Sequence, residues 1–237
     1  MNQKAGFTLI ELSIVLVIIS LIVSGVVASR SLIEQSEIRG LVKRMEQFQV
    51  AFQGFKEKYK YYPGDMPDAT AVWGAATGNG NGDERIVYPT TGTGNNEGLR
   101  AWQQLGEAGF IQGRYTGEGT TDQEAMPGEN VPDLRFSNLL GVYVHHEGWL
   151  LNDAVNLMII GGYNEGTWNN EAGLTVVQAG GIDNKIDDGF PSRGRVWAQG
   201  GQKGASLSVD CTSGTGAAAI YQLENESREC LLAIKID

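Results

Sequence analysis

The chain has little of what enzymes commonly use for catalysis. Its 237 residues include only two histidines and two cysteines. Neither histidine lies near a serine or cysteine in a known nucleophile motif, and there is no Gly-Lys-Ser/Thr phosphate loop and no Cys-x-x-Cys pair. The sequence therefore predicts that the protein is not an enzyme.

Positive charge is also scarce. The chain has 18 Lys and Arg against 28 Asp and Glu, a net charge of −10. Because neutralising phosphates needs a basic surface, bulk charge argues against nucleic acid as a partner. Glycine, in contrast, is abundant: 29 of the 33 glycines follow residue 60, since only residues 6, 25, 40 and 54 precede it. This region should be rich in turns and short strands.

The two cysteines, Cys211 and Cys230, both lie near the end of the sequence. If the N-terminal segment described next targets a membrane, an even pair of cysteines after it favours a disulfide in an oxidising compartment. The alternative is two reduced, buried thiols.

One long uncharged run is present near the start. Leu12 to Ser29 carries no charge and is mostly Ile, Val and Leu, which is about the length that a helix needs to span a bilayer. Glu11 immediately precedes this run. Because a charge inside a membrane segment costs roughly 2.5–3.5 kcal/mol on insertion scales, we expect Glu11 to have a partner.

Three interpretations of this N-terminus compete. A secretory signal peptide would use Lys4 as its positive end and Val26-Val27-Ala28 as its cleavage site, but its apolar stretch is usually only about 7–15 residues long and would not include Glu11. A plain membrane anchor explains the length and leaves Glu11 without a reason. The third interpretation starts from the stretch Gly6-Phe7-Thr8-Leu9-Ile10-Glu11.

This stretch resembles the type IV prepilin signal, a short basic leader ending in Gly, then Phe, then Glu at the fifth mature position. Met1–Arg30 fits the pattern throughout. The resemblance implies that a prepilin peptidase cuts between Gly6 and Phe7 and that the new Phe7 amine is N-methylated. It also implies that Glu11 pairs with the N-terminal amine of a neighbouring subunit, with Thr8 adding a hydroxyl hydrogen bond nearby.

The same resemblance implies partners and a location. The partners are copies of the chain itself, other pilins or pseudopilins, the peptidase and methyltransferase, an inner-membrane assembly platform and membrane lipid. The location is the bacterial inner membrane, crossed once with the head in the periplasm, and later a pilus or pseudopilus.

The helix is predicted to continue beyond the membrane to about Tyr59. Apolar residues recur at steps of three and four, which is typical of one face of an amphipathic helix; they are Ile38, Leu41, Val42, Met45, Phe48, Phe52, Phe55 and Tyr59. Pro63 and Gly64 then end the helix. We therefore expect a leader (1–6), a transmembrane and assembly helix (7–29), its amphipathic continuation (30–62) and a globular α/β head (63–237).

The head should contain both helices and strands. A long Gly-rich loop is expected over 63–98 and helices over 97–108, with Asn95 or Asn96 as N-cap, and 174–187, with Thr175 as N-cap. Strands are expected over 134–136, 139–144, 155–160, 195–198, 217–223 and 230–236. The fold class is therefore α+β: a long N-terminal helix, half membrane-spanning and half amphipathic, packed on an antiparallel sheet.

Two stretches are candidates for a calcium site, and no other cofactor is expected. Oxygen side chains stand at alternate positions in Asn79, Asn81 and Asp83, as in the first half of a calcium loop, although Thr90 occupies the twelfth position. Three carboxylates gather at Asp183, Asp187 and Asp188. The alternatives are a plain turn-rich loop and a solvated helix end. The adjacent His145 and His146 should point to opposite faces of a strand, which disfavours one shared metal.

The leading function is thus a structural subunit of a type IV pilus or of a type II secretion pseudopilus. The alternative is a minor or tip pilin whose head binds a surface or a glycan through Trp73, Trp149 or Trp168. The head also resembles, more weakly, a subgroup of prepilin-like proteins with larger heads, a resemblance carried by Tyr62-Pro63-Gly64-Asp65, the stretch Trp102 to Gly109 and the acidic stretch around Asp187.

Overall fold

The structure is a computed structural model of the 237-residue chain. It describes residues 6, 8–87, 96–119, 121, 123–134, 140–147, 154–203, 206–214 and 216–236. These residues form two compact units, one ending at Gly40 and one starting at Leu41. The second unit therefore begins inside the first helix and includes its last turns.

The first helix, α1, runs from Leu9 to Tyr59 as the sequence predicts. It contains no proline, and its end is marked by Lys60, which has a positive φ of 68°. The Lys60 N–H donates to the Lys56 carbonyl at 2.9 Å, which closes the last turn. The first unit contains the apolar part of α1 and Ile38, and the second contains the rest of the predicted amphipathic face, from Leu41 to Tyr59.

The core of the second unit starts from that face of α1. Its inward side chains are buried: Leu41, Val42, Met45, Phe48, Phe52 and Phe55. They meet Trp102 of α3 (Glu97–Glu107), whose ring lies 4.9 Å from the Phe48 ring and 5.6 Å from the Phe52 ring. Aromatic edge-to-face packing of this kind stabilises a core beyond simple area burial. The confirmed N-cap of α3 is Asn96, whose side chain accepts from Leu99 N–H at 3.1 Å.

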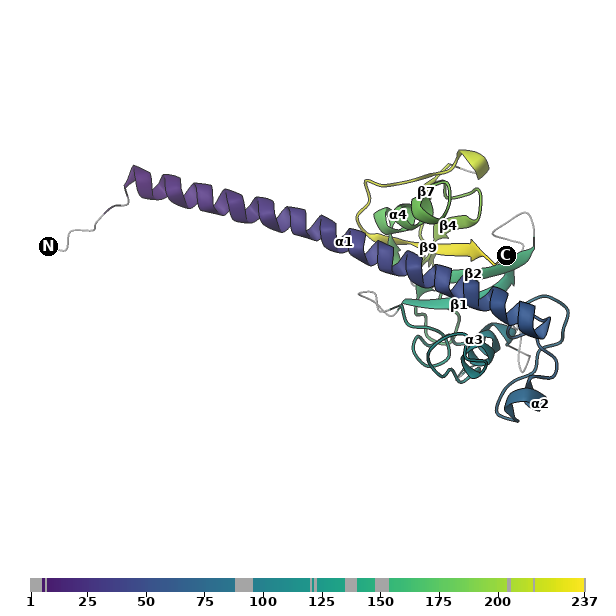
Figure 1. The fold of residues 1–237 in the computed structure, drawn as a ribbon. Helices are drawn as coiled ribbons and strands as arrows, with labels where there is room; N and C mark the ends of the chain where they lie inside the picture. Colours follow the sequence, from purple (N-terminus) through teal and green to yellow (C-terminus); the bar gives the residue numbers. More distant parts are fainter. Residues whose placement is uncertain are drawn as a thin grey trace. The chain divides into compact units, whose positions relative to one another are not determined.

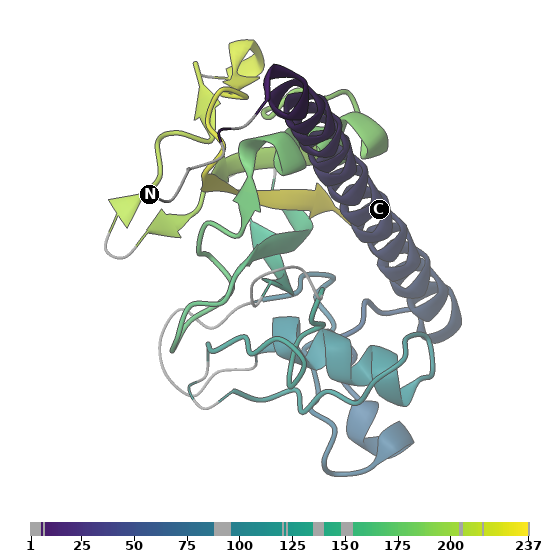
Figure 2. The ribbon, with the colours of Figure 1, turned by 90° about the vertical axis from the view of Figure 1, so that its left-hand side faces the viewer.

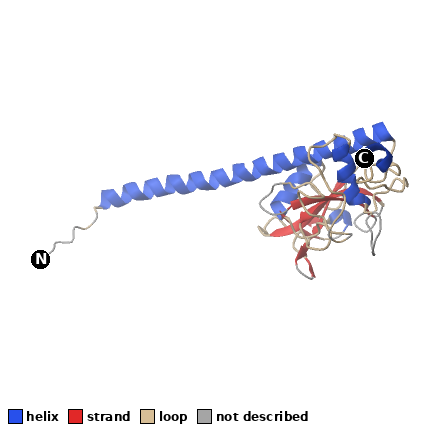
Figure 3. Cartoon of the chain, turned by 90° about the horizontal axis from the view of Figure 1, so that it is seen from below, coloured by secondary structure: helices blue, strands red, loops and turns tan. Residues whose placement is uncertain are grey.

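A five-stranded antiparallel sheet forms the rest of this core (Figures 1 and 3). Its strands are β1 (Leu140–Glu147), β2 (Val155–Gly162), β3 (Leu174–Thr175), β4 (Val196–Gly200) and β9 (Arg228–Lys235). β2 pairs with β1 on one side and β9 on the other, and the far edge of β9 pairs with both β3 and β4. The last long strand in the sequence is therefore central, which explains its uninterrupted apolar run.

Smaller elements surround the sheet (Figure 2). They are α2 (Ala69–Trp73), α4 (Val176–Ile186), a 3-10 turn (Gly216–Ala218) and the paired short strands β5 (Gln202–Lys203) with β6 (Ser206–Leu207) and β7 (Thr212–Ser213) with β8 (Ile220–Tyr221). The predicted disulfide joins Cys211 to Cys230, and so ties the segment before β7 to the central strand. Thr175 caps α4 through a reciprocal capping box with Gln178, as expected for that helix start.

Several predicted elements differ from the structure. The loop over 63–98 contains the short helix α2, which places Trp73 against Tyr59. The strand predicted over 217–223 is wrong: a 3-10 turn occupies its start, and only Ile220–Tyr221 is extended. β1 continues to Glu147, so both histidines lie within the strand. The strand predicted over 134–136 lies mainly outside the described residues, as do residues 90, 95 and 139.

Candidate functional site

The first candidate site is the start of α1. Thr8 is its N-cap residue, and its backbone N–H and its hydroxyl both donate to Glu11 Oε2 at 2.8 Å. In return the Glu11 N–H donates to Thr8 Oγ1 at 3.3 Å. This is a capping box, in which a hydroxyl and a carboxylate three residues apart satisfy donors that the first turn leaves open. Within the chain, Thr8 therefore bonds directly to Glu11 and orients its carboxylate; the pairing of Glu11 with a neighbouring subunit stays a prediction.

Beyond this cap, α1 exposes a continuous apolar surface. The described residues contain one helical segment long and apolar enough to cross a membrane, Leu9–Val26, and none of it is buried. Its serine hydroxyls donate back along the helix, for example Ser13 to the Ile10 carbonyl at 2.8 Å and Ser20 to the Leu16 carbonyl at 2.7 Å. Hydroxyls satisfied within the helix place no open donor in lipid.

Gly6, the expected last residue of the leader, lies just outside the helix and is exposed. A Cβ added at Gly6 would meet no atom within 4 Å. The fold of the chain itself therefore gives no steric reason for glycine at this position. Phe7, on the other side of the expected cleavage point, lies outside the described residues.

Comparison with known families agrees with this geometry. Residues 1–27 match the family described as the prokaryotic N-terminal methylation motif. These residues are the prepilin-type cleavage and methylation signal. The match ends within α1 and does not extend to the head. Comparison with curated proteins and with solved structures gave no match.

Apart from the methylation motif, the head holds two groups of carboxylates. In the first group, one oxygen from each of Asp65, Asp83 and Glu97 lies within 4.8 Å of the other two. Asp65 and Glu97 are almost fully buried, and Asp83 is exposed. Burial without an ion pair is costly for a carboxylate unless hydrogen bonds compensate it, so their donors decide how the group is held.

Backbone N–H groups of the loop over 78–87 supply those donors. The Asp65 carboxylate accepts from three successive backbone N–H groups, those of Gly82 at 2.6 Å, Asp83 at 3.1 Å and Glu84 at 2.9 Å. Glu97 accepts from Asn81 N–H at 3.0 Å and from Val87 N–H at 2.9 Å. Gly80 is needed for this approach, because a Cβ there would lie 2.3 Å from the Asp65 backbone. The two carboxylates therefore fix the loop.

The environment of this group disfavours full ionisation. Burial raises the pKa of Glu97 to about 7, with the charges of Asp65 and Asp83 acting in the same direction and the two N–H donors opposing it. Burial also raises the pKa of Asp65, against the three N–H donors that it accepts from. Crowded, buried carboxylates behave in this way because each charge is deprived of water and repels the next.

The predicted calcium ligands of this loop are only partly brought together. Asn79 Oδ1 accepts from Thr70 N–H at 2.8 Å, and Asn81 Oδ1 accepts from Asp83 N–H at 2.9 Å. Asp83 places a carboxylate oxygen in the group with Asp65 and Glu97. Sequence reasoning missed Asp65 and Glu97, which lie 32 positions apart and whose burial no local pattern indicates.

The second group contains the three predicted residues Asp183, Asp187 and Asp188, with one oxygen of each within 4.8 Å of the others. Asp183 is buried and accepts from Tyr221 Oη at 2.8 Å. Burial raises the pKa of Asp183 to about 6, against the hydrogen bonds from Tyr221 and Gly189. Asp187 Oδ2 accepts from the backbone N–H of Arg195 and from Val196 N–H. These oxygens hold the end of α4 to the start of β4.

The tryptophans named as candidate glycan contacts are not free-standing. Trp73 is half-buried, with its ring 6.0 Å from the Phe55 ring, and Trp168 is half-buried, with its ring 6.3 Å from the Tyr143 ring. Trp149 lies outside the described residues. His146 Nδ1 lies 3.0 Å from Asn156 Oδ1 on the neighbouring strand, and the strand places His145 on the opposite face.

Proposed function

We propose that the protein is a structural subunit of a type IV pilus or of a type II secretion pseudopilus. Prepilin peptidase cuts it between Gly6 and Phe7, the Phe7 amine is methylated, and the chain polymerises through α1. The observation that supports this most strongly is the methylation motif over residues 1–27, with Glu11 held in the capping box ahead of an exposed apolar helix.

The capping box supports a specific role for Glu11. Both contacts from Thr8 use Oε2, and no donor among the described residues is recorded for Oε1. In a filament core of packed apolar helices, an unpaired carboxylate and an unpaired amine would each be costly. We propose that Oε1 receives the Phe7 amine of a neighbouring subunit and that this pairing sets the register of assembly.

The surroundings of Gly6 support the processing step. Because a side chain at Gly6 would meet nothing in the chain itself, the glycine serves a partner that binds this segment, and a protease cleft admits an unsubstituted backbone most closely. The membrane topology that follows is a single span with the head in the periplasm, before extraction into the filament by an assembly platform.

Mass spectrometry of the purified protein tests the proposal directly. A chain produced in a bacterium with an active prepilin peptidase should begin at methylated Phe7. In a strain that lacks the peptidase it should keep Met1 to Gly6. A chain beginning at Met1 or at Ser29 in the first strain contradicts the proposal.

The alternative, a tip subunit whose head binds a glycan, gains little from Trp73 and Trp168, which are both partly packed. A glycan panel applied to the detergent-solubilised chain checks it. The calcium sites stay a prediction, and calorimetric titration of the same preparation with calcium checks both groups of carboxylates.

A further inference from the structure

The end of α1 is rich in positive charge. We call Lys56, Lys58 and Lys60 the basic end; with Glu57 included, residues 56–60 have three positive and one negative side chains, a net charge of +2. The Lys56 Nζ lies 3.7 Å from the centre of the Tyr62 ring, and the Lys58 Nζ lies 4.8 Å from that of Tyr59. Aromatic faces attract cations without cancelling their charge, and no ion pair to these lysines is recorded among the described residues.

Lys60 holds a strained backbone conformation directly after the last turn of α1. Its φ of 68° lies in the left-handed region, the position after a helix where glycine is usual, and a residue with a Cβ is strained there. Lysines near a helix C-terminus also stabilise the helix dipole. That effect accounts for Lys56 and Lys58 and does not require a third lysine beyond the last turn.

A second surface of the same unit is acidic. We call Glu124, Glu129 and Glu165 the acidic loops. Tyr163 Oη donates to the Glu124 carboxylate, and this hydrogen bond, with burial and the charges of Glu124, Glu165 and Glu129, raises the pKa of Tyr163 to about 12. Glu129 and Glu165 are exposed.

The sequence around the acidic loops offers no local cation. No lysine or arginine occurs between Arg114 and Arg135, nor between Arg135 and Lys185. No ion pair to the three glutamates is recorded in the described part of the chain. Glu129 and Glu165 therefore present negative charge to solvent, whereas Glu124 is buried and accepts from the Tyr163 hydroxyl.

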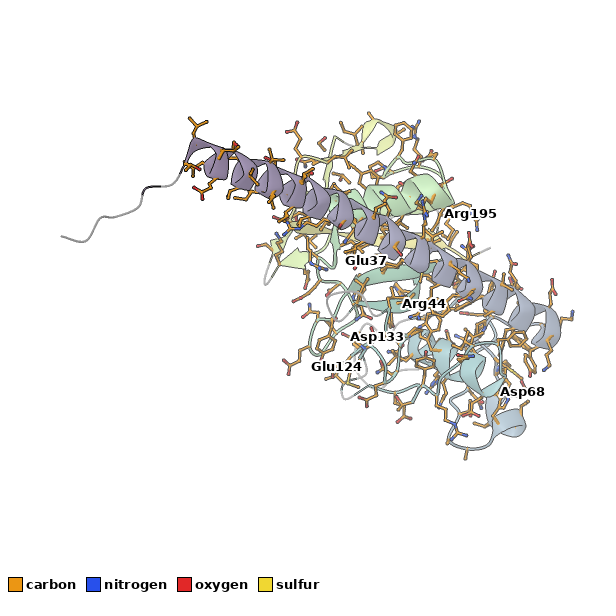
Figure 4. The ribbon with its side chains drawn as sticks, turned by 60° about the vertical axis from the view of Figure 1, so that its left-hand side comes forward. Glu37, Arg44, Asp68, Glu124, Asp133 and Arg195 are labelled. Carbon is orange, nitrogen blue, oxygen red and sulfur yellow. A yellow bond between two sulfur atoms is a disulfide. The ribbon has the colours of Figure 1, made fainter. Side chains whose placement is uncertain are left out.

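The two surfaces lie apart on the second unit. Figure 4 shows Glu124 well away from the end of α1, which lies near the labelled Asp68. Within one chain the basic end and the acidic loops therefore do not contact each other. A contact that joins two different surfaces of identical copies is heterologous, and repeated without closing it builds a helical filament.

We infer that the basic end of one subunit docks on the acidic loops of a neighbouring copy in the filament. The inference rests on the proposed function, and it adds a contact between heads to the assembly through α1. A second copy fits better than nucleic acid, because it satisfies both surfaces at once and because a chain of net charge −10 repels phosphates. Complementary charge gives such a contact its orientation and register more than its strength.

Charge reversal on each surface tests this contact. Lys58→Glu with Lys60→Glu, and separately Glu129→Lys with Glu165→Lys, place like charges opposite each other. Each pair should lower the fraction of processed subunit in sheared, sedimented filaments by at least about five-fold, since several weak charge pairs become repulsive. The variant carrying all four reversals keeps the wild-type net charge and should return to within about two-fold of wild type.

A matched control reverses two exposed carboxylates elsewhere, Asp210→Lys with Glu224→Lys, and should assemble as wild type. Thermal melting identical to wild type shows that each variant is folded, and a mature start at Phe7 shows that processing is intact. Processed reversal variants that form filaments at the wild-type level would overturn the inference. So would a four-fold variant that assembles no better than either pair, and either result would leave the proposed function standing. A wild-type chain that is neither cut nor polymerised would instead contradict the proposed function.

Discussion

At the scale of single residues, the capping box makes Thr8 a positioning residue for Glu11. Thr8→Ala removes the hydroxyl that accepts from the Glu11 N–H and donates to its carboxylate, a loss of about 1 kcal/mol at an N-cap. Hydrogen exchange of the Glu11 amide, measured in detergent micelles, should become about five-fold faster. Thr8→Ser keeps the hydroxyl and should exchange as wild type. Equal exchange in the two variants would show that the box does not hold the first turn.

Gly6 provides a second test at this scale. Gly6→Val should leave the fold unchanged, because nothing lies near the added side chain. It should slow cleavage about ten-fold or more, since a small displacement of the cleaved bond in the protease lowers the reaction rate by at least that factor. The ratio of uncut to cut chain by mass spectrometry measures this. Gly25→Val, also at a site without neighbours within 4 Å, is the control and should be cut normally.

Glu97 should make stability depend on pH. Its folded pKa of about 7 is above the ordinary value of 4.5, so between these pH values the folded state binds more protons than the unfolded state. Its contribution to the free energy of unfolding is therefore largest below pH 4.5 and falls as pH rises to 7, by at most about 1.4 kcal/mol per pH unit. Urea titrations of wild type and Glu97→Gln should differ by this slope; parallel curves would contradict the prediction.

At the scale of elements, the sequence predicted those helices whose bounds are set by apolar periodicity and by capping side chains. The apolar period gave α1 to within two residues, and the caps at Asn96 and Thr175 marked the starts of α3 and α4. The strand over 217–223 failed because its alternation is short and tertiary contacts replaced it with a 3-10 turn. Burial of Asp65 and Glu97 could not be predicted, because it arises from packing between distant segments.

The disulfide is the strongest single tie between elements. It connects the start of the β7–β8 pair to β9 across 19 positions, and closing a loop of this length contributes roughly 3 kcal/mol in the chain-entropy model. Cys211→Ser with Cys230→Ser should lower the free energy of unfolding by about that amount in urea titration. Because the disulfide lies within the second unit and the cleavage point lies at the start of the first, cleavage before Phe7 should be unaffected.

At the scale of the whole molecule, the two units carry separate tasks. The second unit has its own buried core, from Leu41 onward. The apolar part of α1 is exposed along its whole length, so it requires lipid or other copies of itself around it. Under the proposed function the membrane is the first of these environments and a bundle of identical helices is the second.

Glu11 should therefore matter for assembly and not for insertion. Glu11→Ala removes a charge that opposes insertion, so the variant should enter the membrane at least as well as wild type. It leaves the amine of a neighbouring Phe7 unpaired in an apolar core, which costs several kcal/mol, so the fraction of subunit recovered in sheared filaments should fall at least about ten-fold. Glu37→Ala, an exposed carboxylate further along α1, is the control and should assemble normally. Membrane fractionation and sedimentation of the same cells separate the two steps, and normal filaments from Glu11→Ala would show that the charge pair is dispensable.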